Sequence, residues 1–241
     1  MNDFYLNLIV QGAMAALVLF SVVTWVLIVA KGVQNWRLAR QDRAFSKQFW
    51  SASSLDAAAQ LERDAGPKAR VASVGFDALY VTDSVADTDL EHSWDRKELL
   101  ERHLRQQIQK EHASRESGLA ILASIGSTAP FVGLFGTVFG IIHALTAISK
   151  SASASIDVVA GPIGEALIAT GVGIAVAVPA VLAYNFYVRR LKVAALELDN
   201  YAGDLLNLAQ KSAYRIARVA AVPKAQPSQG QGKAPAQGVF A

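Results

Sequence analysis

Residues 118–148, GLAILASIGSTAPFVGLFGTVFGIIHALTAI, form a long apolar run whose only titratable side chain is His143. Two further stretches have the same character: residues 8–30 contain no charged residue, and residues 158–188 contain one, Glu165. Each stretch is longer than the roughly 20 residues that an α-helix needs to cross about 30 Å of hydrocarbon. The sequence therefore predicts an all-α integral membrane protein with three transmembrane helices.

The composition agrees with a membrane protein whose charges are segregated. Hydrophobic residues make up 52% of the 241 residues and charged residues only 18%, while the mean hydropathy is +0.27. Three buried helices of a soluble protein are the alternative, but a soluble core does not cover three such helices on all sides. The net charge of +3 gives no reason to expect a nucleic-acid partner.

The sequence predicts no metal site and no cofactor. It contains no cysteine, so disulfides, thiolate ligands and thiol nucleophiles are excluded. Its four histidines show no metal-ligand pairing by spacing: His92, His103, His112 and His143.

The first apolar run has a second interpretation, as a secretory signal peptide. Only Asp3 is charged before this run, so the basic segment that opens a signal peptide is lacking, and no small-residue cleavage site ends it. Lys31 and a basic cluster follow it, which is typical of a stop-transfer flank. We therefore interpret residues 8–30 as a membrane anchor.

Lysine and arginine residues predict the orientation in the membrane. They concentrate after the first span, before the second and after the third: Lys31, Arg37, Arg40, Arg43, Lys47, Lys110, Arg115, Arg189, Arg190 and Lys192. Because basic residues favour the cytoplasmic side, we expect residues 31–117 and the C-terminus to be cytoplasmic. The N-terminal residues 1–7 and the connection 149–157 then lie outside.

The larger extramembrane portion, residues 31–117, is predicted to be helical. Leu38–Asp64 and Ala69–Tyr80 are two expected helices, and Ser93 could cap a third. No proline or glycine follows Ser93 until Gly118, so we expect one continuous rod from the cytoplasm into the second span.

The third span is also expected to continue as a helix, over residues 189–222. Leu191, Leu198 and Leu205 lie seven residues apart and predict a seam that packs on other helices. A helix lying on the bilayer surface is the alternative, but its acidic residues would face an anionic leaflet. Residues 223–241 are rich in proline, glycine and glutamine and are expected to be disordered.

Glu165 is the residue that most directly indicates a function. A charged side chain at the centre of a membrane helix costs about 2.5–3.5 kcal/mol on insertion scales, so such residues usually mark an ion path, a proton site or a buried pair. A hydrogen bond that only joins two helices is the structural alternative.

The second and third spans are rich in small and hydroxyl-bearing residues. Glycines permit close helix packing, prolines permit kinks, and a threonine in a membrane helix usually bonds back to its own backbone. The residues concerned are Gly133, Gly136 and Gly140, Pro130 and Pro179, and Thr137 and Thr170.

Depth in the membrane groups the polar residues of the two spans. With a rise of about 1.5 Å per residue, Thr137 lies roughly 6 Å and Thr170 roughly 4–5 Å to the outer side of their span centres. Glu165 and His143 lie roughly 12 and 15 Å to the same side. We therefore expect the threonines to share a layer, and Glu165 and His143 to come within hydrogen-bonding reach, directly or through water.

The sequences of these spans resemble the ExbB/TolQ/MotA proton-channel family. The resemblance rests on STAPFVGLFGTVFGIIHALT at residues 127–146, VAGPIGEALIAT at 159–170 and PAVLAYN at 179–185. Within the family the match is nearest to the ExbB branch, and TolQ of the Tol-Pal envelope system is the alternative. The order Gly161-Pro162 departs from the Pro-Gly of many relatives.

The resemblance implies a multi-pass protein of the bacterial inner membrane, with the N-terminus periplasmic, that is a motor subunit and not an enzyme. In this family five copies form a ring, and their second and third spans line a pore around an ExbD-like single-span partner that carries an aspartate. The family's pore threonines map onto Thr137 and Thr170, and its membrane glutamate onto Glu165. The proton motive force would be used through a TonB-like protein to energise outer-membrane uptake of iron-siderophores and vitamin B12.

Other classes of function explain less of the sequence. A flagellar stator subunit normally has four spans, and a passive membrane scaffold gives no reason for Glu165 and two hydroxyls in the outer half of the spans. The spans hold no Ser/His, Asp/Asp or zinc-ligand pair, which disfavours an intramembrane enzyme.

Overall fold

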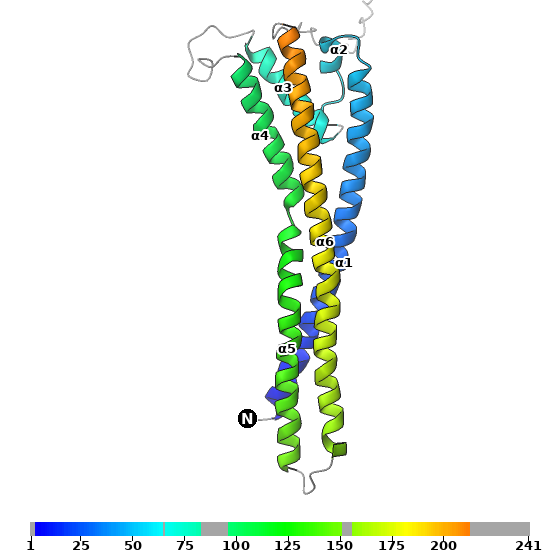
Figure 1. Cartoon of the computed structure of the whole chain (residues 1–241), viewed down its shortest axis with the longest axis vertical. Coiled ribbons are helices and arrows are strands. Elements are labelled where there is room, and N and C mark those ends of the chain that lie inside the picture. Colours follow the sequence, from blue (N-terminus) through cyan, green and yellow to red (C-terminus); the bar gives the residue numbers. More distant parts are fainter. Residues whose placement is uncertain (1–2, 65, 83–95, 151–155, 213–241) are drawn as a thin grey trace, which may run out of the picture.

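The computed structural model describes residues 3–64, 66–82, 96–150 and 156–212. These residues form a long bundle of α-helices without a strand, in which α5 and α6 run side by side (Figure 1). The helices are α1 (Asp3–Trp50), α2 (Leu55–Ala59), α3 (Pro67–Thr82), α4 (Arg96–Glu116), α5 (Leu119–Lys150) and α6 (Ile156–Lys211).

Three helices, α1, α5 and α6, are long and apolar enough to cross a membrane. This confirms the predicted all-α fold with three membrane-spanning helices. Large apolar side chains cover their surfaces, and Val26, Phe131 and Leu182 are 60%, 70% and 64% exposed. Such surfaces are unfavourable in water but are the expected surface of a helix in lipid.

The spans α5 and α6 pack antiparallel with their backbones in contact. A Cβ atom added to Gly133 would lie 2.7 Å from the carbonyl oxygen of Ala169, and one added to Gly140 would lie 2.5 Å from the Cβ of Ala166. Only glycine fits at this separation. Both helices continue through their internal prolines, which are Pro130 in α5 and Pro162 and Pro179 in α6.

The predicted continuous rod from α4 into the second span is wrong. Helix α4 ends at Glu116, and Gly118 has a φ of 82°, in the left-handed region that commonly ends a helix. The Nζ atom of Lys31 donates to the carbonyl oxygen of Arg115 at 3.0 Å and so satisfies a carbonyl at this helix end. The second span therefore begins as a new helix.

The expected helix over Leu38–Asp64 is interrupted in the structure. Helix α1 runs unbroken from the first apolar run to Trp50, so the first part of that segment belongs to α1. The chain then turns, and Ser54 caps the short α2 by accepting a hydrogen bond from the Ala57 N–H at 3.1 Å. Ser93 lies outside the described residues.

The structure tests the other segment predictions only in part, because some of their residues lie outside the described ranges. The expected helix Ala69–Tyr80 lies within α3. The expected helix over residues 189–222 corresponds to the end of α6, described as far as residue 212. Residues 223–241 and part of the connection 149–157 lie outside the described residues.

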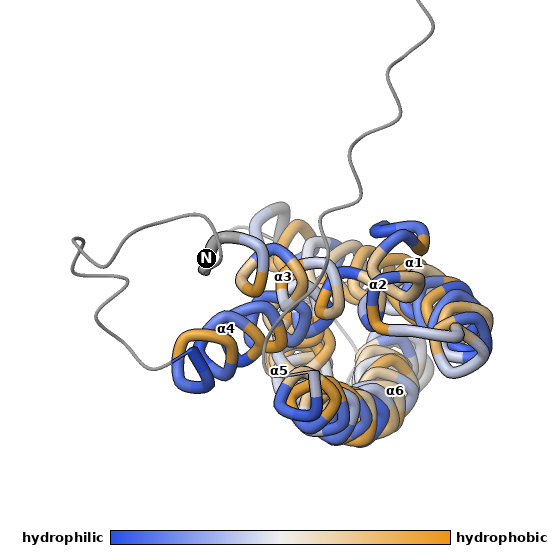
Figure 2. The backbone as a smooth tube through the Cα atoms, turned by 90° about the horizontal axis from the view of Figure 1, so that it is seen from above, coloured by the Kyte–Doolittle hydropathy of each residue, from blue (hydrophilic) through white to orange (hydrophobic). Residues whose placement is uncertain are grey.

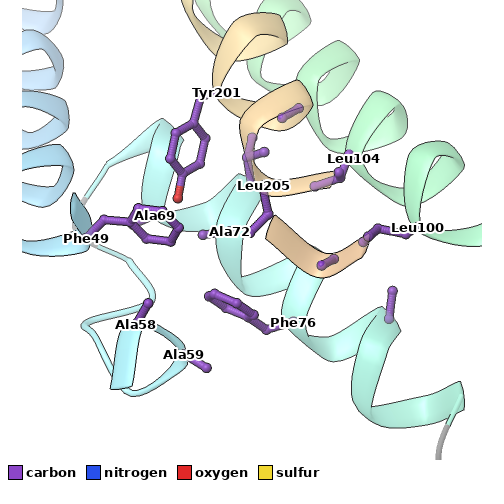
Figure 3. Packing of buried hydrophobic residues seen from close by; sticks show 14 of the residues in the cluster. Phe49, Ala58, Ala59, Ala69, Ala72, Phe76, Leu100, Leu104, Tyr201 and Leu205 are labelled. Atoms are coloured by element: carbon purple, nitrogen blue, oxygen red, sulfur yellow. The ribbon is translucent and has the colours of Figure 1, made fainter. Parts of the chain in front are cut away.

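A second packing unit lies beyond the membrane spans, and we call it the extramembrane bundle. It comprises α2, α3 and α4 together with the C-terminal ends of α1 and α6, which pass beside them (Figure 1). Its core joins aromatic and aliphatic side chains from these helices, including Phe49, Phe76, Leu100 and Leu205 (Figure 3). Hydrophilic and hydrophobic residues alternate along α4 (Figure 2), and its exposed residues are mainly hydrophilic.

The end of α6 packs against this core and is not a helix on the bilayer surface. Leu198 and Leu205, two members of the predicted seam, are 3% and 0% exposed and belong to the core of the extramembrane bundle. Leu191, the third member, is buried in the cluster between the spans. The three leucines therefore pack against helices of the same chain.

Candidate functional site

The Oγ1 atoms of Thr137 on α5 and Thr170 on α6 lie 2.9 Å apart, at hydrogen-bond distance. Thr137 is 6% exposed, whereas Thr170 is half-buried. The distance places both hydroxyls in one layer of the membrane spans, as the depth comparison predicts. They form a polar contact inside an otherwise apolar helix pair.

The backbone contacts of Thr137 suggest a direction for this hydrogen bond. Its Oγ1 also lies 2.7 Å from the carbonyl oxygen of Leu134 and 3.3 Å from that of Gly133. A threonine hydroxyl has one proton to donate and two lone pairs. If Thr137 donates its proton to the Leu134 carbonyl oxygen, the Thr170 hydroxyl donates to Thr137. The lone pairs of the Thr170 oxygen then remain available to accept a hydrogen bond from another group.

The close approach of the two helices brings these short side chains together. A Cβ atom added to Gly136 would lie 3.0 Å from the Cβ of Ala169, and one added to Gly173 would lie 2.7 Å from the carbonyl oxygen of Ala129. Larger residues at these positions would hold the helices apart. A hydroxyl one carbon from the backbone reaches its partner only at such a small separation.

Glu165 and His143 do not meet in the structure. The Glu165 side chain is exposed, His143 is half-buried, and no hydrogen bond or ion pair joins them in the part of the chain that is described. Ala166 packs on Gly140, and each residue turns a helix by about 100°. Glu165 is therefore rotated to the side of the helix contact, and the expected direct hydrogen bond to His143 is not formed.

Glu165 and Thr170 lie on opposite sides of the surface that α6 presents to α5. Ala166, Ala169 and Gly173 form the centre of that surface. At about 100° per residue, Glu165 lies to one side of this centre and Thr170 to the other. The two polar positions of α6 thus face different surroundings within one chain.

A buried polar junction outside the spans was missed by the sequence reasoning. Asp42 of α1 accepts a hydrogen bond from the Lys68 N–H at 2.9 Å and so caps α3 from another helix. Burial raises the pKa of the Asp42 carboxyl, although the Lys68 N–H and the Arg115 guanidinium act to lower it. Because these residues are far apart in the sequence, no local motif could have indicated the contact.

A bidentate ion pair completes this junction. The Nε and Nη2 atoms of Arg70 each lie 2.7 Å from a carboxylate oxygen of Glu111, which joins α3 to α4. Gln107 donates to the same carboxylate at 2.8 Å. The hydrogen bonds that Arg70 donates to the Glu111 carboxylate raise the pKa of the Arg70 guanidinium. These contacts fix the extramembrane bundle and carry no sign of catalysis.

A model of the MotA/TolQ/ExbB proton channel family matches residues 66–200, more than half of the chain. The chain belongs to this family. The match spans α3 to most of α6 and includes Thr137, Glu165 and Thr170. The protein is accordingly a multi-pass membrane subunit of a proton-channel family, which is not an enzyme class.

Curated relatives point to the ExbB branch of the family. The biopolymer transport protein ExbB of Neisseria meningitidis serogroup A is 38% identical over 195 residues, which cover 80% of this chain and 89% of the relative. ExbB of Xanthomonas campestris pv. campestris is 34% identical over 209 residues, covering 85% and 81%. The Tol-Pal system protein TolQ of Haemophilus influenzae is 29% identical over 212 residues, covering 86% and 92%.

Proposed function

We propose that this family member is an ExbB-type subunit of a proton-driven complex of the bacterial inner membrane. Its partners would be further copies of itself in a ring of five, an ExbD-like single-span protein with a membrane aspartate, and a TonB-like protein. The N-terminus would be periplasmic and the C-terminus cytoplasmic. The complex would energise outer-membrane uptake of iron-siderophores and vitamin B12.

The observation that carries this proposal is the hydroxyl pair of Thr137 and Thr170 at 2.9 Å between two touching helices. Threonine hydroxyls are too weakly acidic to carry a proton themselves, so the carrier is the partner's carboxyl group. The half-buried Thr170 oxygen would accept a hydrogen bond from the protonated carboxyl. Thr137 would hold that hydroxyl in place, because it is itself anchored to the α5 backbone.

The exposed Glu165 would supply a second polar position on the proton route. An unpaired carboxyl group is unfavourable against lipid, which favours a place for this side chain against another subunit. Glu165 and Thr170 lie on opposite sides of the α5-facing surface, so a ring could present them to different neighbours. A proton crossing the membrane releases about 2.3 kcal/mol per 100 mV, so a few protons supply useful mechanical work.

Proton flux in reconstituted vesicles tests this function. The chain is incorporated together with its aspartate-bearing partner, and flux is measured for the unmodified protein, for Thr137→Val and for Thr128→Val. Thr128 lies on the same helix, but its exposed hydroxyl only bonds back to the Ser124 carbonyl at 2.7 Å. Flux should fall at least tenfold in Thr137→Val and persist in Thr128→Val. Equal flux in all three assembled proteins would contradict the proposal.

A further inference from the structure

A cavity of about 480 Å³ lies between α1 and α6, where the membrane spans meet the extramembrane bundle. We call it the basic cavity, because four cationic side chains line it and only two carboxylates do. The cations are Arg43, Lys68, Arg115 and Arg190, and the carboxylates are Asp42 and Glu197. The walls of the cavity therefore carry a net positive charge.

Arg115 is largely buried, and part of its guanidinium group makes no hydrogen bond within the described residues. Its side chain is only 10% exposed, and its Nη2 atom forms an ion pair with Asp42 at 3.6 Å, which is longer than a hydrogen bond. The Nε and Nη2 atoms of Arg115 are buried and make no hydrogen bond within the described residues. Asp42 also serves as the cap of α3 through Lys68. A buried guanidinium with unused donors is unfavourable unless further hydrogen-bond acceptors approach it, and an anion supplies both acceptors and the opposite charge.

The ends of the apolar runs place the cavity at the level where lipid headgroups are expected. It lies just beyond the ends of the first and third apolar runs, and its rim carries Trp36 and Phe186, which are 65% and 54% exposed. Aromatic side chains concentrate at this level of a membrane. The Arg190 guanidinium lies 5.3 Å from the centre of the Phe186 ring, so charge and apolar surface adjoin at the rim.

Apolar strips lead from the rim into the membrane on both walls. On α1, Val29 and Val33 precede Trp36 at helical spacing and are 61% and 50% exposed. On α6, Leu182 precedes Phe186 by one turn and is 64% exposed. A free phosphate ion would use only the basic cavity, whereas a phospholipid would also cover these strips with its acyl chains.

We propose that the basic cavity binds the phosphate group of an anionic phospholipid, with its acyl chains lying along the exposed strips of α1 and α6. Basic pockets beside membrane helices are suited to acidic headgroups. The anion would face Arg115 and Arg190 from between the two helices. This inference depends on the three-span architecture and is independent of proton transfer.

Lipid binding to the full-length protein, purified as its native assembly in detergent, tests the inference. The melting temperature is titrated with phosphatidylglycerol, with zwitterionic phosphatidylcholine and with inorganic phosphate. Unmodified protein is compared with Arg190→Gln, Arg115→Gln and Arg105→Gln. The last is the matched control, because Arg105 loses the same charge on α4 but is 71% exposed and paired with Glu101.

Phosphatidylglycerol should raise the melting temperature more than either other addition. Its apparent affinity should fall roughly fivefold for each cavity arginine removed, which is the scale of one basic residue near an anionic lipid, and stay unchanged in Arg105→Gln. If Arg115→Gln fails to fold, Arg190→Gln on the rim decides the question. Equal effects of the two lipids, an equal effect of inorganic phosphate, or undiminished binding by Arg190→Gln would each overturn the inference.

Discussion

The hydroxyl oxygens of Thr137 and Thr170 lie 2.9 Å apart between α5 and α6, in a layer where the two backbones are in close contact. The contact needs glycine and alanine around it, because a threonine side chain is short. The hydroxyl pair and the small-residue packing are therefore one feature of the molecule. A substitution that separates the two helices should therefore also lengthen the distance between the two hydroxyl oxygens.

Substitution of Gly133 should open the helix pair. A Cβ atom there would lie 2.7 Å from the Ala169 carbonyl oxygen, so the backbones must separate. We expect Gly133→Ala to reduce stability by about 1–3 kcal/mol, the usual cost of overpacking. Gly171→Ala is the matched control, because nothing lies within 4 Å of its added Cβ atom. Thermal unfolding in detergent measures both, and equal melting temperatures would refute the packing account.

Removal of Arg70 should destabilise the extramembrane bundle. The change Arg70→Ala leaves the Glu111 carboxylate, 8% exposed, without its bidentate partner, and uncompensated buried charges cost about 3–5 kcal/mol. One third of the Arg70 side chain is exposed, so we expect the lower end of that range. Arg63→Ala breaks an exposed pair with Asp77 and should cost at most about 1 kcal/mol. Denaturant unfolding that gave both variants the same loss would contradict this ranking.

Substitution of Gly118 should strain the junction between α4 and α5. Its φ of 82° is disfavoured for residues with a Cβ atom, by about 1–2 kcal/mol. We expect Gly118→Ala to lower the melting temperature or to straighten the junction into a longer helix. Gly203→Ala, in an open position of α6, should be neutral or stabilising because alanine favours helix. A Gly118→Ala protein as stable as Gly203→Ala, with unchanged helix content by circular dichroism, would disprove this role.

The three membrane spans could be predicted because each apolar run is longer than a bilayer is thick. The layer shared by Thr137 and Thr170 could also be predicted, because helical rise converts sequence position into depth. The side of the helix on which a residue lies was harder to predict: Glu165 is rotated to the side of the helix contact and makes no direct hydrogen bond to His143 in the described residues. That rotation depends on which small residues pack together.

Features outside the spans depended on contacts between distant residues. The hydrogen bond from the Lys68 N–H to Asp42 joins the start of α3 to α1. Neither Lys68 nor Asp42 is unusual in its own segment. The break between α4 and α5 at Gly118 was missed because glycine is also common inside membrane helices. The left-handed φ of Gly118 and the hydrogen bond from Lys31 to the Arg115 carbonyl mark the helix end in the structure.

The most direct test of the central claim compares Thr170→Ser with Thr170→Val in vesicles that hold the chain and its aspartate-bearing partner. Serine keeps the hydroxyl oxygen and valine replaces it with a methyl group of similar size. The account predicts that Thr170→Ser retains most of the proton flux and that Thr170→Val loses at least tenfold, with the assembly intact in both. Equal flux through the two variants would contradict it.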